Sequence, residues 1–294
     1  MKSERPYLAV FRAGAGSVHR RVLAEDPSRN WDCLFNAWMD PATIPGPATE
    51  EFVFLDGENK YDGFAAILQR EEALIRRYRY VLLADDDVYF QPGELSRLFS
   101  LCEEHHLYLA QPALRWGTNV NHVVTLWNPA SRVRRVSFVE VMTPVFSIDA
   151  LLELAPTFTL SRSTYGIDLA WGALLRDRAA IHVVDAIRVD HLRPVDWTGG
   201  PFYRKLSALG VDPAAETRAV KARYGEFGGV RTRTGGHVAR LPLGVALGDA
   251  SVVAVDRMIL AWRTALDRAW RVWRWLRGRP IPRFPGDTGN PESK

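Results

Sequence analysis

Apolar and polar positions alternate along the chain in short blocks that predict strands and helices in turn. Short apolar runs bounded by charged, proline or glycine residues indicate strands at residues 7–11, 52–55, 80–84, 107–110, 181–184 and 187–189. Apolar residues at helical spacing predict helices at residues 63–78, from Pro92 onward, 148–154 and 167–175. This alternation predicts an α/β fold with a mostly parallel central sheet.

Beyond residue 250 the pattern becomes one long amphipathic helix. Apolar residues recur at steps of three and four, at Val255, Ile259, Trp262, Leu266, Trp270, Trp273 and Leu276. Basic helices that carry tryptophan are typical of anionic membrane surfaces, whereas the alternative is packing on the domain or on a partner. We therefore expect one large domain over residues 1–240, a basic amphipathic helix over 250–278 and a disordered tail over 279–294.

Composition and charge indicate which kinds of binding partner to expect. The chain has 294 residues, of which 47% are hydrophobic, enough for a sizeable core. The net charge of +4 equals that of the segment from Asp256 to Arg277, which holds six arginines and two aspartates, so the rest of the chain sums to zero. No basic face for nucleic acid is expected. Two cysteines and the absence of a signal-like N-terminus predict a cytoplasmic location, peripheral to the membrane if the C-terminal helix binds lipid.

The strongest chemical signal is the run Asp85-Asp86-Asp87 directly after the expected strand 80–84. Ligands of open α/β sheets bind beyond the carboxyl ends of the strands. Clustered carboxylates there suit magnesium or manganese, especially when substrate phosphates complete the coordination. Alternation along an extended chain would place Asp85 and Asp87 on one side, as a D-x-D pair that bridges a metal to a diphosphate, and Asp86 on the other. The alternative is a solvated acidic turn.

Four further positions carry weaker signals, each with a structural alternative. Asp168 opens an apolar helix after a glycine turn and is either a general base or an aspartate favoured by the helix dipole. His191 follows a strand and is either a third metal ligand or a structural histidine. Lys60 either contacts phosphates or is a solvated loop lysine. A turn after the first strand, where the backbone can approach a nucleotide, contains Arg12, Gly14 and Gly16.

Several spaced motifs resemble the domain-of-unknown-function 707 family, which is itself similar to GT-A type nucleotide-sugar glycosyltransferases. The resemblance covers about residues 5–200 and rests on Tyr7-Leu-Ala-Val-Phe-Arg-Ala-Gly-Ala-Gly-Ser-Val-His19, Arg29-Asn-Trp-Asp32, Tyr80-Val-Leu-Leu-Ala-Asp-Asp-Asp87, Leu109-Ala-Gln-Pro-Ala113 and Val139-Glu-Val-Met-Thr-Pro-Val-Phe146. It implies a GT-A (Rossmann-like) nucleotide-diphospho-sugar transferase fold with a D-x-D metal site and an acceptor cleft.

The resemblance also implies roles for single residues. Asp85 and Asp87 match the D-x-D pair, and His191 matches a late histidine that completes the metal shell. Asp168 matches the acidic base of inverting members. The turn after Arg12 would face the base and ribose of the nucleotide. Asp86 would turn toward the nucleotide or the sheet. The family's first motif has an acidic residue where this chain has Ala15, so that carboxylate has no counterpart here. Two residues would lie toward the acceptor, Trp116 and Glu140.

Together these features predict a metal-dependent glycosyltransferase that acts in polysaccharide biosynthesis. It would move a sugar from a nucleotide-sugar donor to a glycan or lipid-linked acceptor, with inversion expected and retention left open. Two alternatives remain at this stage: a non-catalytic glycan-binding or scaffold protein with the same fold, and another metal-dependent phosphate-processing enzyme. The donor, the acceptor and the oligomeric state are not encoded in any pattern that we recognise.

Overall fold

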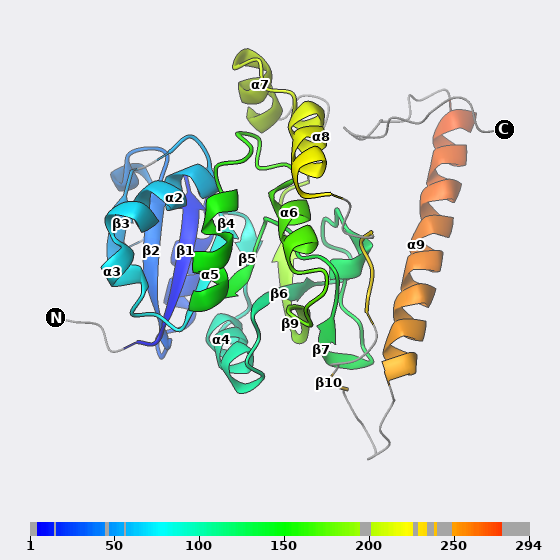
Figure 1. Cartoon of the computed structure of the whole chain (residues 1–294), viewed down its shortest axis with the longest axis horizontal. Coiled ribbons are helices and arrows are strands. Elements are labelled where there is room, and N and C mark those ends of the chain that lie inside the picture. The colour runs from blue at the N-terminus through cyan, green and yellow to red at the C-terminus, as the bar shows by residue number, and fades with distance from the viewer. Residues whose placement is uncertain are drawn as a thin grey trace.

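The structure is a computed structural model that describes residues 5–14, 16–44, 47–55, 57–194, 201–225, 229–233, 238–239 and 249–277. Within these residues the chain forms an α/β fold with helices on both faces of one central sheet (Figure 1). The expected tail over 279–294 and Ala15 lie outside the described residues. None of the helices in the described segments is both long and apolar enough to cross a bilayer.

Ten strands of the described chain form the sheet. They are β1 (Tyr7–Ala13), β2 (Trp31–Ala37), β3 (Phe52–Phe54), β4 (Tyr80–Asp85), β5 (Val88–Tyr89), β6 (Leu109–Leu114), β7 (Ser131–Arg135), β8 (Val145–Ser147), β9 (Ile181–His191) and β10 (Val238–Ala239). The order across the sheet is β10-β7-β9-β6-β8-β4-β1-β2-β3, and β5 pairs with β9. The three longest pairings, β1 with β2, β1 with β4 and β6 with β9, are parallel.

Eight α-helices and three 3₁₀ turns lie between the described strands, and a ninth helix follows the last of these strands. The α-helices are α1 (His19–Ala24), α2 (Lys60–Arg70), α3 (Glu72–Ile75), α4 (Glu94–Glu104), α5 (Ile148–Leu154), α6 (Ile167–Leu174), α7 (Pro201–Ala208), α8 (Pro213–Tyr224) and α9 (Asp249–Leu276). The 3₁₀ turns are η1 (Pro41–Thr43), η2 (Val123–Thr125) and η3 (Ala155–Thr157).

The apolar strand β1 explains how the sheet is covered on both faces. Alternate residues of β1 enter two different hydrophobic clusters, with Ala9 and Phe11 in one and Leu8 and Val10 in the other. Residues of α1 and α4 complete the first cluster, whereas residues of α2, α5 and α6 complete the second. A strand that is buried on both faces reads as a continuous apolar run, which is why β1 and β4 are recognisable from the sequence.

The predicted α/β fold with a mostly parallel central sheet and a C-terminal helix is confirmed, although several boundaries differ. The expected helix over 63–78 begins earlier, at Lys60, because the Asn59 side chain caps it by accepting from the backbone N–H groups of Tyr61 and Asp62 at 2.9 Å each. It also divides at Glu71 into α2 and α3.

The two expected short strands over 181–184 and 187–189 form one continuous strand, β9. The interruption in the apolar pattern is Asp185, a fully buried residue that forms an ion pair with Arg134 of the neighbouring strand β7 at 2.9 Å. A buried, paired carboxylate breaks the hydrophobic pattern without breaking the strand.

Candidate active site

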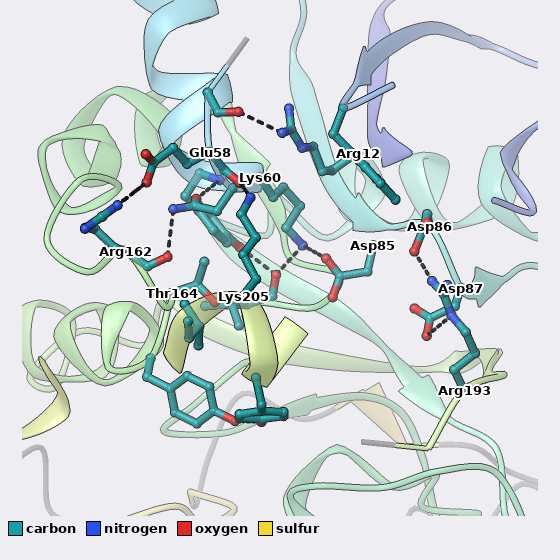
Figure 2. A pocket seen from close by; sticks show the side chains of 18 of the residues that line it. Arg12, Glu58, Lys60, Asp85, Asp86, Asp87, Arg162, Thr164, Arg193 and Lys205 are labelled. Atoms are coloured by element: carbon teal, nitrogen blue, oxygen red, sulfur yellow. Dashed lines mark hydrogen bonds and ion pairs between the residues drawn. The ribbon is translucent and has the colours of Figure 1, made fainter. Parts of the chain in front are cut away.

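A cavity of about 1130 Å³ opens at the carboxyl ends of β1, β2 and β4. These strands are in register there, with Arg12 of β1 beside Asp85 of β4 and Asn36 of β2. The remaining wall comes from the start of α2, the loop before α6, the end of β9 and α7. The three aspartates line this cavity, as do Arg12 and Lys60 (Figure 2). His191 also lines it. Gly14, Gly16 and Asp168 are not among the residues that line it.

The aspartate run bends away from the strand after its first residue. Asp85 ends β4, and Asp86 and Asp87 form a turn that leads into β5. The carbonyl of Asp86 accepts from the Val18 N–H at 2.9 Å, and the carbonyl of Asp87 accepts from the Leu192 N–H at 3.0 Å. The expected alternation of an extended chain therefore does not apply beyond Asp85, because the backbone turns there. All three carboxylates face the cavity.

Asp85 is balanced by a buried lysine. The Lys60 Nζ lies 2.7 Å from Asp85 Oδ1 and donates to the carbonyls of Val141 at 2.6 Å and Met142 at 3.0 Å. Burial lowers the pKa of Lys60, and the Asp85 carboxylate opposes this effect. Burial also raises the pKa of Asp85, while Lys60 opposes the rise. Lys60 is only 6% exposed, so its interpretation as a solvated loop lysine is wrong.

Asp86 and Asp87 share a different cation, Arg193. One arm of its guanidinium contacts Asp86 Oδ1, and its Nε lies 3.1 Å from Asp87 Oδ2 (Figure 2). Burial, reinforced by repulsion from the other two aspartates, raises the pKa of Asp86 to about 6, although Arg193 opposes the rise. For Asp87, burial is outweighed by hydrogen bonds from His191 and Arg193, and its pKa falls below the usual range. Arg193 follows β9 in a short polar stretch and was not predicted.

His191 is oriented toward Asp87. Its Nε2 lies 3.4 Å from Asp87 Oδ2, and its Nδ1 lies 3.1 Å from the carbonyl of Asn119. Because a carbonyl only accepts, Nδ1 carries a proton and Nε2 faces the carboxylate. Burial lowers the pKa of His191, but the neighbouring Asp87 carboxylate outweighs it and the net pKa is raised.

The side chains of Asp87 and His191 fit a divalent cation. A histidine whose second nitrogen is held by a carbonyl is the usual arrangement for a metal ligand. Within the described residues, no group of three or more His, Cys, Asp or Glu side chains converges at metal-binding distances. Magnesium and manganese commonly take only one or two protein carboxylates and complete their shell with phosphate oxygens and water. The predicted set of Asp85, Asp87 and His191 remains a prediction, with Asp85 paired to Lys60.

The glycine turn after β1 supports an aromatic wall that the sequence analysis missed. A Cβ on Gly14 would lie 2.3 Å from the Trp38 ring, so only glycine allows the indole to lie against this backbone. Trp38 lines the cavity and remains 59% exposed. A Cβ on Gly16 would come no nearer than 3.5 Å to Arg193. Arg12 also lines the cavity, and its Nη2 donates to the Gly57 carbonyl at 2.8 Å.

Asp168 lies in the first turn of α6 and is not among the residues that line the cavity. Its carboxylate accepts from the backbone N–H of Leu169 at 2.9 Å and also from that of Val141, which lines the cavity. Burial raises the pKa of Asp168 to about 6, with repulsion from Glu140 adding to the rise and His122 opposing it. Asp168 is thus a carboxylate with a near-neutral pKa next to the wall.

The loop before α6 forms another part of the cavity wall, and one of its residues has a strained backbone conformation. Thr164 lines the cavity at a φ of +66°, a left-handed conformation that is costly for a β-branched residue. The loop is held by Glu216 of α8, which accepts from the backbone N–H groups of Arg162 and Ser163 at 2.9 Å each. The sequence predicts a glycine turn before α6, but no local pattern reveals that the loop is held by a distant helix.

The two residues expected toward the acceptor do not line the cavity. The Trp116 indole donates to the Trp127 carbonyl at 3.0 Å, and its ring lies 5.4 Å from that of Trp262 in α9. Glu140 is buried and accepts from the Thr125 hydroxyl at 2.6 Å.

No family model matches the chain, and no curated protein matches it either. Among solved structures, it is similar to GalNAc-T7 with UDP, GalNAc and Mn²⁺, with 9% identity, a TM-score of 0.46, and coverage of 74% of this chain and 47% of that one. It is also similar to S. aureus TarS 1-349, with 12% identity, a TM-score of 0.43, and coverage of 75% and 70%.

The chain spans about half the length of the GalNAc-T7 structure that it matches. At this distance the likeness carries no argument about activity, and the resemblance to the domain-of-unknown-function 707 family remains a prediction.

The packing of Trp38 on Gly14 is testable by substitution. Gly14→Ala should displace the indole, because the new Cβ would overlap the ring. We expect the free energy of unfolding to change by only about 1 kcal/mol or less, since the ring is exposed and can rotate away. The measurement is the indole N–H resonance of Trp38, assigned with Trp38→Phe. Gly16→Ala is the matched control and should leave this resonance in place. An unmoved resonance in Gly14→Ala would contradict the packing.

Proposed function

We propose that the chain is a metal-dependent glycosyltransferase that moves a sugar from a nucleotide-sugar donor to a glycan or lipid-linked acceptor. One observation carries the proposal: three carboxylates at the end of β4 meet a lysine, an arginine and a histidine on the wall of a large cavity. Donor diphosphates are recognised by just such a mixture of metal ligands and fixed cations. The cavity is also of a size that suits a nucleotide-sugar.

Asp87 and His191 would hold the cation, manganese or magnesium, with Asp85 beside them. When bound, a divalent cation supplies neutralisation of the negative charge on a diphosphate leaving group. Arg193 is half exposed and presents a planar set of N–H donors at the same edge, a geometry that matches phosphate oxygens. Lys60 holds Asp85 in place from the buried side through its contacts with the Val141 and Met142 carbonyls.

Trp38 and Arg12 would form the nucleotide end of the cavity. Trp38 presents an exposed indole face on which a base or ribose can pack. Arg12 is fixed by its bond to the Gly57 carbonyl, which holds its guanidinium at the cavity wall. In this arrangement Gly14 contributes by leaving room for the Trp38 ring, and neither Gly14 nor Gly16 lines the cavity.

Asp168 is our candidate for the general base of an inverting transfer. It would remove the proton from the acceptor hydroxyl as the acceptor oxygen forms a bond to the anomeric carbon and the bond to the diphosphate breaks. A base with a pKa of about 6 is ionised at neutral pH and still basic enough to accept the proton. Val141 and Tyr165 form the adjacent wall, where the acceptor would enter.

The direct experiment is a panel of sugar nucleotides, assayed for release of the nucleoside diphosphate with manganese and with a chelator. The proposal predicts turnover of at least one donor that stops when the metal is removed. A non-catalytic scaffold protein would bind glycan without turning over any donor. A phosphate-processing enzyme would release inorganic phosphate or nucleoside monophosphate instead of transferring sugar. Either of these two results would reject the proposal.

Replacement of Asp168 tests the base. We expect Asp168→Asn to lower kcat by about 10²- to 10⁴-fold while donor binding persists. In the unmodified protein, kcat should rise with pH through about 6, because the base is active only when it is ionised. The control is Asp149→Asn, which changes an exposed first-turn aspartate of α5. If Asp168→Asn and Asp149→Asn have the same kcat, Asp168 is not the base and only interacts favourably with the helix dipole of α6.

A further inference from the structure

The first half of α9 is attached firmly to the domain. The buried Arg134 of β7 contacts Asp256 of this helix at 2.7 Å and Asp185 of β9 at 2.9 Å. The Asn128 side chain also donates to Asp256 at 2.8 Å and to the Val252 carbonyl at 3.1 Å. A buried arginine between two carboxylates is costly to disrupt, so these contacts fix the helix on the β7 side of the sheet (Figure 1).

Most of the large exposed apolar side chains described on this helix lie on one side, and Leu260 is the exception. We call this side the apolar flank, and it consists of Met258, Trp262, Leu266, Trp273 and Leu276. Steps of four, four, seven and three residues keep these side chains on one face of a helix. They are between 44% and 70% exposed. The flank spans about 27 Å at 1.5 Å per residue. Of its five residues, Trp262 also packs against the ring of Trp116.

Arginines outnumber aspartates on this helix. The segment from Asp256 to Arg277 holds six arginines and two aspartates. One of the two, Asp256, is already paired with Arg134. Arginine side chains at positions 257, 263, 268 and 277 therefore give the helix a net positive charge beside the apolar flank. The combination of tryptophan, aliphatic side chains and arginine matches an anionic lipid surface, in which rings enter the interface and guanidinium groups meet phosphates.

We propose that the apolar flank of α9 docks on the surface of an anionic bilayer, with the helix parallel to the membrane plane. Charge favours lipid over a second copy of this chain, because two such helices brought together would place like charges side by side. The rigid attachment of α9 through Asp256 would then hold the whole domain at a fixed position on the membrane. This inference is independent of the proposed enzymatic activity, since it concerns a surface outside the cavity.

Vesicle co-sedimentation of the full chain tests the proposal. We expect binding to vesicles of phosphatidylcholine that contain a quarter phosphatidylglycerol, and at least tenfold weaker binding to phosphatidylcholine alone. Added salt should weaken the binding, because it screens the arginines. Absence of binding to the anionic vesicles would overturn the proposal.

A charge-matched pair of variants separates insertion of the flank from simple electrostatics. Leu266→Glu with Trp273→Glu places two carboxylates on the flank, whereas Ala261→Glu with Thr264→Glu places two on other exposed positions of the helix. We expect the flank variant to bind at least about tenfold more weakly than its control, with both retaining the same helical content. Equal loss in the two variants would overturn the docking surface. So would a stable dimer of the unmodified protein, without vesicles, that the flank variant abolishes.

Discussion

Three neighbouring carboxylates at the end of a buried strand repel one another and lose solvation, so the surrounding chain must supply positive charge. This chain supplies it from two directions. Lys60 approaches Asp85 from the start of α2, while His191 and Arg193 approach Asp87 from the end of β9. The position of β9 in the sheet is therefore tied to the charge at the end of β4, and a short pairing of β5 with β9 joins the two backbones.

The need to pair buried carboxylates with cations also explains how the C-terminal helix α9 is attached. Asp185 interrupts the apolar pattern of β9 and is stable there because Arg134 reaches it from β7. Arg134 then has N–H groups left over, and Asp256 of α9 accepts from one of them. Arg134 thus joins β7 to β9 through Asp185, and it joins β7 to α9 through Asp256. The proposed lipid-binding surface is held in place by this chain of ion pairs.

The features that the sequence predicts are those that depend on local pattern. Buried strands such as β4, the aspartate run at its end and the long helix α9 follow from local pattern and were correctly placed. The predicted stripe of α9 is divided, because Ile259 is buried against the domain while Trp262 and Leu266 are exposed. The features that were missed depend on partners far away in the chain. Trp38 is positioned by Gly14, which lies 24 residues earlier. Thr164 is held in a strained conformation by Glu216 of α8, which braces its loop. The turn after Asp85 was missed for the same reason. It is held by hydrogen bonds from the backbone N–H groups of Val18 and Leu192, which the alternation of side chains along a strand does not reveal.

We expect Asp87 and the residues around it to bind a divalent cation together with a diphosphate. The most direct measurement is calorimetry of nucleoside diphosphate binding, with UDP, GDP, ADP and CDP, in manganese and in chelator. We predict that at least one binds tightly only with the metal. Asp87→Asn should weaken this binding by at least the roughly 10- to 100-fold that the loss of a residue supporting a metal ligand costs. Glu58→Gln, which removes the same charge from another part of the cavity wall, should preserve it. Metal-dependent binding that is unchanged in Asp87→Asn, or absent for all four nucleotides, would contradict the account.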